Sequence, residues 1–319
     1  MLPRLSLLVS LGATLVACSS GGNAATTTGA GGSGSASSSA ATGGSTSAGG
    51  SDAGPIGGDR PVSVSVPDTY VKGKPTPLLI LLHGYGASGV LEDAYLGFTT
   101  EAFKRGWLYA FPDGTLDPTT MARYWNASDA CCAPPGSTVD DSTYLSQLIK
   151  DISAQYTVDP KRVYFVGHSN GGFMSYRMAC DHADQVAAFV SLAGAMPADV
   201  SKCNPSQPVS MLEIHGTADT VIAYDGAAIA GKAYPGATTS VGDWVTLDGC
   251  SPTGDTTPAP LDLEATLPGD ETTVTRYAAG CKAGGHAELW TIVGGSHIPD
   301  PSMAFTPDVF DFLAAHARP

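Results

Sequence analysis

The stretch that decides the fold is RVYFVGHSNGGFMSYRMAC, residues 162–180, in which an apolar run ends at a serine between glycines. The run is short, and helix-forming residues follow it, so we expect a buried strand to turn into a helix at Ser169. Gly167 and Gly171 would let strand and helix approach closely, with the serine exposed at the apex. This context distinguishes a nucleophile elbow from the alternative, a tight turn with a helix-capping serine.

Apolar runs alternate with helical stretches on both sides of this turn, which predicts one α/β domain with a mostly parallel, doubly wound sheet. Strands are expected within residues 60–67 (an edge strand), 77–84, 107–114, 162–167, 186–194, 209–216, 273–278 and 287–295. Helices are expected at residues 91–105, 140–156, from 170 onward, and at 308–317.

Ligands of such sheets bind beyond the carboxyl ends of the strands, where Ser169 is expected. Asp219 follows the strand VSMLEIHG, and His297 follows the strand AELWTIVGG. The order serine, acid, histidine is that of the α/β-hydrolase triad. We therefore predict Ser169 as nucleophile, His297 as its base and Asp219 as the acid that orients the histidine.

Three other residues compete for the acid and base roles. Asp225 lies close to Asp219 in the sequence. His286 precedes its strand, at the wrong end of the sheet, and His316 falls on the final helix. These positions favour Asp219 and His297.

The oxyanion of an acyl transfer reaction needs two backbone N–H donors. Asn170 follows the predicted nucleophile, and Tyr85 follows the first buried strand in LLHGYGASG. We predict these two amides as the oxyanion hole. The Tyr85 ring is also a candidate substrate contact, whereas His83 is expected to hold its loop.

Composition excludes some functions. With 16 basic and 30 acidic residues, the net charge is −14, which disfavours binding to nucleic acid. No Cys/His spacing of the zinc type appears, so neither metal nor cofactor is expected. Nothing indicates more than a monomer.

The first 58 residues indicate export. Residues 1–18 resemble a lipoprotein signal peptide that ends in LVAC, with Cys18 as the lipidated residue; ordinary signal cleavage is the alternative. Residues 19–58 are rich in Gly, Ser, Ala and Thr and predict a flexible tether. The catalytic domain is expected at 59–319, exported and lipid-anchored to the envelope or secreted.

The remaining six cysteines fit three disulfides of an exported domain. We expect Cys250 to pair with Cys281. Because adjacent cysteines rarely bond to each other, the Cys131/Cys132 doublet is expected to bridge Cys180 and Cys203.

Several motifs in order resemble the secreted poly(3-hydroxybutyrate) depolymerase-like and feruloyl esterase family of α/β-hydrolases. They are LLHGYGASG, FPDG, WN, CC, VDDSTYL, VDPKRVYFVGHSNGGFMSYRMAC, HGTAD, VTRY and GGSH. The resemblance implies the same triad and ester hydrolysis, on feruloyl or aryl esters or on polyesters. Acetyl xylan esterase and cutinase-type polyester hydrolase activities share the fold and are alternatives. Two further alternatives are peptidase chemistry on the same fold and an inactive, tethered binding protein.

Two positions depart from the family pattern. GGSHIP, residues 294–299, stands where members often carry GGGHTWP, so a tryptophan of the substrate cleft is missing. Tyr85 stands where many members have cysteine, and is more similar to cutinase-type hydrolases. Trp125, in the loop before the cysteine doublet, is a candidate substrate contact; packing against the disulfide region is the alternative.

Overall fold

The computed structural model describes residues 55–319. The predicted signal peptide, Cys18 and the tether up to residue 54 lie outside the described residues. Within them, Ile56 packs against the core, and the Gly57 amide donates a hydrogen bond to Asp151 Oδ2 at 3.1 Å. Contacts of the folded domain therefore include Ile56 and Gly57.

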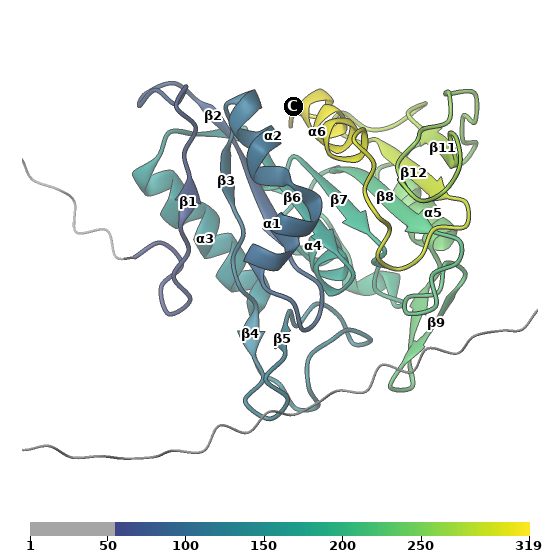
Figure 1. The fold of residues 1–319 in the computed structure, drawn as a ribbon, viewed down its shortest axis with the longest axis horizontal. Helices are drawn as coiled ribbons and strands as arrows, with labels where there is room; N and C mark the ends of the chain where they lie inside the picture. The colour runs from purple at the N-terminus through teal and green to yellow at the C-terminus, as the bar shows by residue number, and fades with distance from the viewer. Residues whose placement is uncertain (1–54) are drawn as a thin grey trace, which may run out of the picture. The chain divides into compact units, whose positions relative to one another are not determined.

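An eight-stranded sheet forms the centre of the described domain, in the order β1-β3-β2-β6-β7-β8-β12-β11 (Figure 1). The strands are β1 (Val64–Ser65), β2 (Thr76–Leu82), β3 (Leu108–Ala110), β6 (Val158–His168), β7 (Ala188–Leu192), β8 (Ser210–Gly216), β11 (Thr272–Tyr277) and β12 (Ala287–Ile292). The six central strands are parallel, and the edge strands β1 and β11 are antiparallel to their neighbours. The predicted doubly wound sheet is confirmed.

Helices cover both faces of the sheet, as Figure 1 shows. They are α1 (Gly89–Leu96), α2 (Phe98–Arg105), α3 (Asp141–Gln155), α4 (Asn170–Asp181), α5 (Ala237–Leu247) and α6 (Phe305–Ala315). Leu78, Ile80 and Leu82 of β2 belong to the core cluster with α3, α4 and α5, whereas Leu79 and Leu81 belong to the cluster with α2 and α6. Because successive strand residues point to opposite faces, the continuous apolar run of β2 supplies both cores.

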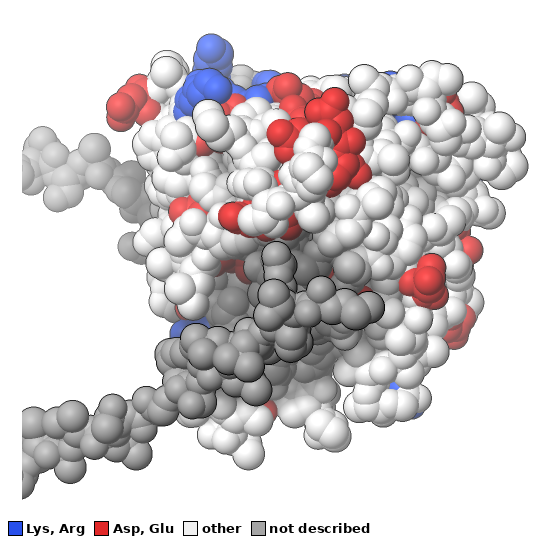
Figure 2. Space-filling view, turned by 45° about the vertical axis from the view of Figure 1, so that its right-hand side comes forward, with Lys and Arg blue, Asp and Glu red and all other residues white. Residues whose placement is uncertain are grey.

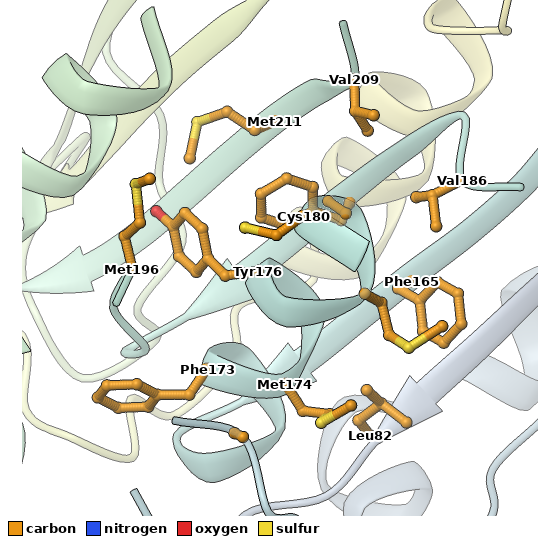
Figure 3. Packing of buried hydrophobic residues seen from close by; sticks show 14 of the residues in the cluster. Leu82, Phe165, Phe173, Met174, Tyr176, Cys180, Val186, Met196, Val209 and Met211 are labelled. Carbon is orange, nitrogen blue, oxygen red and sulfur yellow. The ribbon is translucent and has the colours of Figure 1, made fainter. Parts of the chain in front are cut away.

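Helix α4 packs its apolar side against the sheet. Phe173, Met174 and Tyr176 are buried there, in the cluster that also holds Phe165 of β6 and Met211 of β8 (Figure 3). This packing fixes the start of α4, and therefore the turn at Ser169, relative to the strand ends.

The helix expected at 91–105 is two helices. Gly97 ends α1 in the left-handed conformation, with φ of 68°. Asp93 holds the corner, because its carboxylate accepts hydrogen bonds from the Thr99 amide and hydroxyl and from the Tyr109 hydroxyl. Helix α5 was not expected, since its sequence ATTSVGDWVTL contains few strong helix formers. Two short hairpins also lie outside the expectations: β4 (Thr115–Leu116) with β5 (Arg123–Tyr124), and β9 (Gly226–Ile229) with β10 (Lys232–Pro235).

Three disulfides join the described cysteines, and one prediction about them is wrong. Cys250–Cys281 forms as expected, but Cys180 pairs with Cys203, and Cys131 bonds its neighbour Cys132. Cys180, on the last turn of α4, lies with its Cα 4.7 Å from that of Cys203, so neither is left for the doublet. The two Cα atoms of the doublet lie 3.0 Å apart.

Figure 2 shows acidic side chains in several groups on one face, most of which carries no charge. Among residues 55–319, no cluster of three or more His, Cys, Asp or Glu side chains is arranged to bind a metal ion. No helix of that part of the chain combines the length and apolarity needed to span a bilayer.

Asp248, at the end of α5, makes stability depend on pH. Its side chain is buried; Oδ1 accepts a hydrogen bond from the Val209 amide at 3.2 Å, and Oδ2 has no partner among the described residues. Burial raises the pKa of Asp248 from 3.8 to about 7. Between these two pKa values the folded chain binds more protons than the unfolded chain. The free energy of unfolding therefore falls as the pH rises through this range, because Asp248 must ionise while buried.

We therefore expect Asp248→Asn to be more stable than the parent protein at pH 8, by about 3 kcal/mol, and close to it at pH 4. Urea unfolding at pH 4, 6 and 8 measures the difference, with the exposed Asp225→Asn as control. A difference that does not grow with pH would contradict the prediction.

Candidate active site

Ser169 lies at the turn between β6 and α4, with φ of 53° and ψ of −117°. A positive φ is uncommon for a residue with a side chain and marks a strained turn. The flanking glycines are required by space: a Cβ on Gly167 would lie 2.1 Å from the Gly171 carbonyl oxygen, and one on Gly171 would lie 2.0 Å from the Leu82 carbonyl oxygen. The sequence pattern thus produces the elbow geometry.

The loops after β8 and β12 bring an acid and a histidine to Ser169. His297 Nε2 lies 2.9 Å from Ser169 Oγ, and His297 Nδ1 lies 2.7 Å from Asp219 Oδ2. The other oxygen, Asp219 Oδ1, accepts hydrogen bonds from the amides of Val221 and Ile222 at 2.8 and 2.9 Å. Burial would raise the pKa of Asp219, but the hydrogen bonds that its carboxylate accepts from histidine lower it far below its ordinary value. Asp219 is therefore ionised and fixed in orientation.

The competing residues lie elsewhere. Asp225 is exposed. His286 Nε2 lies 2.8 Å from the Glu288 carboxylate at the opposite end of β12, and its ring packs on His316, with 4.3 Å between the centroids. Burial lowers the pKa of His316 to about 4. None of the three is placed to act on Ser169.

The two predicted oxyanion donors flank Ser169. A Cβ built on Gly84 would lie 3.5 Å from Ser169 Cβ, so the loop that carries Tyr85 passes beside the nucleophile. The backbone amides of Tyr85 and Asn170 form no hydrogen bond with any residue of the described chain. The Tyr85 side chain is 49% exposed at this end of the sheet. Neither amide thus has a partner within the described chain, and Asn170 as a whole is buried.

Trp125 does not face the crevice, and its prediction as a substrate contact is wrong. The side chain is fully buried, and its indole N–H donates to the His83 carbonyl at 3.1 Å. The Trp125 amide and carbonyl hold the Asn170 side chain through bonds of 2.7 and 2.9 Å. Trp125 therefore positions the Asn170 side chain, next to Ser169.

His83 is buried and holds its own loop. Its Nε2 accepts a hydrogen bond from the Gly114 amide at 2.8 Å, so its Nδ1 carries the proton and donates to the Gly84 carbonyl at 2.7 Å. Burial lowers the pKa of His83, which keeps it neutral. The expected structural role agrees with these contacts.

A buried contact between a carboxylate and a histidine beneath the site was not predicted. Glu92 of α1 accepts a hydrogen bond from the Gly84 amide at 3.0 Å, and its other oxygen lies 3.3 Å from His168 Nδ1. His168 Nε2 donates to the His297 carbonyl at 2.9 Å. Burial would lower the pKa of His168, but Glu92 outweighs it and raises the value. The pair links the loop of Gly84 to the loop of His297.

Removing Glu92 is expected to destabilise the fold strongly. Glu92→Ala leaves a buried imidazole and the Gly84 amide without their partner, which costs about 3 kcal/mol or more. Glu92→Gln keeps an acceptor for the Gly84 amide and should lose less stability. Chemical denaturation of both variants measures the effect, and a loss below about 1 kcal/mol in Glu92→Ala would show that the pair is not needed.

A model of the phospholipase/carboxylesterase family matches residues 69–252, more than half of the chain. The chain belongs to the phospholipase/carboxylesterase family. Gly167, Ser169, Gly171 and Asp219 fall within the matched range, and His297 follows it.

Curated relatives of this family member include several esterases. Feruloyl esterase B of Piromyces equi is 31% identical over 246 residues, which cover 75% of this chain and 42% of that protein. The putative esterase NocK of Nocardia uniformis subsp. tsuyamanensis is 27% identical over 241 residues, 73% of this chain and 68% of NocK. The bifunctional acetylxylan esterase/xylanase XynS20E of Neocallimastix patriciarum is 28% identical over 168 residues, 53% of this chain and 22% of that protein. The chain thus spans less than half the length of the first and third.

Solved structures confirm the α/β-hydrolase fold of this phospholipase/carboxylesterase family member. The acetyl xylan esterase from Aspergillus awamori superposes with a TM-score of 0.55 at 15% identity, over 82% of this chain and 97% of that chain. Esterase PE8 superposes with a TM-score of 0.52 at 17% identity, over 81% and 98%.

Proposed function

We propose that the chain is a serine carboxylic ester hydrolase that works through an acyl-enzyme at Ser169. The observation that carries the proposal is the unbroken series of contacts from Ser169 Oγ through His297 to Asp219, on a nucleophile elbow. This arrangement lets a neutral imidazole take the serine proton while a carboxylate fixes the imidazole's orientation.

The reaction follows from these positions. His297 Nε2 accepts the Ser169 proton as Oγ attacks the ester carbonyl, and the amides of Tyr85 and Asn170 stabilise the oxyanion. The alcohol leaves with the proton from His297. Water then attacks the acyl-enzyme by the same route and releases the acid.

Feruloyl or other aryl esters are the substrates we favour, because a feruloyl esterase covers most of this chain at 31% identity. Esters on polysaccharides, such as acetylated xylan, are the second candidate, favoured by the acetylxylan esterase among the relatives. Polyesters are a third class of substrate for the test. The exposed Tyr85 ring is proposed to contact the acyl group of the ester.

The enzyme is proposed to be an exported monomer anchored by a lipid on Cys18. Three disulfides within residues 55–319 support an oxidising compartment. Metabolic labelling with palmitate that persists in Cys18→Ser would contradict the anchor, and light scattering measures the oligomeric state.

The test of the function is hydrolysis of para-nitrophenyl acetate and butyrate, methyl ferulate, acetylated xylan and a polyhydroxybutyrate suspension by the full chain. Matched anilides of the same acyl groups separate esterase from amidase chemistry. Turnover of esters that exceeds that of the anilides supports the proposal and ranks the acyl groups. No turnover of any substrate would favour a binding protein.

A further inference from the structure

The Asp219 carboxylate contacts a second buried histidine besides His297. His215, the residue before the end of β8, places Nε2 3.3 Å from Asp219 Oδ2 and 2.8 Å from the Ile222 carbonyl oxygen. The same Oδ2 accepts the hydrogen bond of His297, whereas Oδ1 is held by two backbone amides. Asp219 therefore lies between two imidazoles.

Behind His215 lies a buried carboxylate with its own partner. Glu213 is two residues earlier on β8, so its side chain lies on the same face of the sheet. Its Oε1 is 3.1 Å from His215 Nδ1, and its Oε2 accepts a hydrogen bond from the Tyr176 hydroxyl at 3.0 Å. Glu213, His215 and Tyr176 are all at most 1% exposed. Polar contacts thus run without a break from Tyr176 on α4 to Ser169.

The protons on His215 follow from the atoms that face its ring. Nε2 faces two oxygen acceptors, the carbonyl of Ile222 and the carboxylate of Asp219, so it carries a hydrogen. One further proton is shared between Nδ1 and Glu213 Oε1, on the imidazole or on the carboxyl. With the proton on either atom, the Nε2 hydrogen is donated to the Ile222 carbonyl, and the same N–H group lies 3.3 Å from Asp219 Oδ2.

We propose that Glu213 and His215 are positioning residues of the triad, which act through Asp219. The N–H of His215 holds the carboxylate in line with His297 and reduces its basicity, and Glu213 keeps that N–H in place. The inference rests on the proposed esterase function, because the effect appears in the base, His297.

The ionisable groups around this pair are few. Tyr176 faces it from α4, Tyr224 faces it with a ring centroid 5.6 Å from that of His215, and His297 lies beyond Asp219. Burial would lower the pKa of His215, but hydrogen bonds to Asp219 and Glu213 outweigh it and raise the value to about 9. His215 therefore keeps its protons through the acidic limb of a pH–rate profile, and that limb reports the base of the reaction.

Two amide variants separate the contacts of His215. In His215→Gln the longer side chain brings an N–H toward the position of Nε2 and Asp219. In His215→Asn the shorter side chain matches Nδ1, keeps a partner for Glu213 and does not reach Asp219. Without the donor, Asp219 becomes more basic and stabilises protonated His297 more.

The experiment measures kcat and KM for para-nitrophenyl butyrate from pH 5 to 9, with melting temperatures as a check of folding. For His215→Asn we expect the acidic limb to move up by about one pH unit, with kcat lower by about tenfold and KM unchanged. His215→Gln and Glu213→Gln, which both keep an N–H toward Asp219, should remain near the parent profile. An unshifted limb in His215→Asn, or an equal shift in His215→Gln, would overturn the proposal.

A second measurement does not depend on ester turnover. The low-field proton resonance of the His297–Asp219 hydrogen bond is expected to move in His215→Asn, which removes the donor near Asp219, and to stay close to the parent position in His215→Gln. An unmoved resonance in His215→Asn would overturn the positioning role. An absence of ester hydrolysis in the parent protein, by contrast, would refute the proposed function while this resonance still tests His215.

Discussion

Ser169→Ala is expected to lower kcat for an ester substrate by about 10⁵-fold or more, because no other group is placed to attack the carbonyl. His297 Nε2 is 2.9 Å from Ser169 Oγ, so removing either partner disables the same step. The double variant Ser169→Ala/His297→Ala should therefore be barely slower than Ser169→Ala alone. We expect the residual rate to come from substrate binding and from the proposed oxyanion donors, the amides of Tyr85 and Asn170.

Steady-state kinetics measure these losses of kcat in the parent protein, in both single variants and in the double variant. A fluorophosphonate label is an independent probe of the nucleophile. Labelling should vanish in Ser169→Ala, whose alanine removes one oxygen atom and leaves the turn intact. If the loss of kcat in the double variant equals the product of the losses in the two single variants, serine and histidine do not act as one unit. Label retained in Ser169→Ala would place the nucleophile elsewhere.

Asp219→Asn is expected to lower kcat by about 10⁴-fold with little change in the fold. The asparagine oxygen still accepts from the Val221 and Ile222 amides, which turns its NH₂ group toward His297 Nδ1. That group donates where the carboxylate accepted, so the His297 proton moves to Nε2. In this tautomer the imidazole has no lone pair for the Ser169 proton.

Asp225→Asn is the matched control for this variant, since it makes the same chemical change six residues later on an exposed side chain. We expect its kcat to stay within about twofold of the parent value, as for a surface substitution. Measurement above pH 8 adds a second check, because hydroxide partly restores proton transfer when the tautomer is wrong. Equal losses in the two variants would contradict the assignment of Asp219.

Much of the site was predictable because its residues follow apolar strands. The parallel sheet brings the carboxyl ends of β2, β6 and β8 to one edge, so a residue that follows one of these strands, such as Asp219, could be placed from the local sequence. The turn at Ser169 requires glycines at fixed spacing, and this pattern located Ser169. The edge strand β1 was also predictable, since its sequence alternates between apolar and polar residues. Its antiparallel direction and the place of β11 at the other edge were not predicted. The split at Gly97 was missed because the side-chain contacts of Asp93 with Thr99 and Tyr109 decide it.

The buried partners of the triad depend on contacts that local sequence does not show. Glu92 precedes His168 by many residues, and only the packing of α1 brings them together. One signal was present: Glu213 and His215 are two ionisable residues at alternate positions of a strand that is otherwise apolar. Buried charges require partners, so this spacing indicates a paired site on one face of the sheet. The doublet disulfide and the burial of Trp125 offered no comparable signal.

The position of His297 in the chain has a consequence for the order of folding. The histidine follows β12, which is inserted between β8 and β11, and β8 lies more than seventy residues earlier. Contacts so distant in sequence form slowly, because the loop between them must close first. A chain still emerging from the ribosome contains Ser169 long before His297 has been synthesised. If the proposed function holds, hydrolytic activity appears only after β12 has docked between β8 and β11, and it therefore serves as an assay for the completion of the sheet.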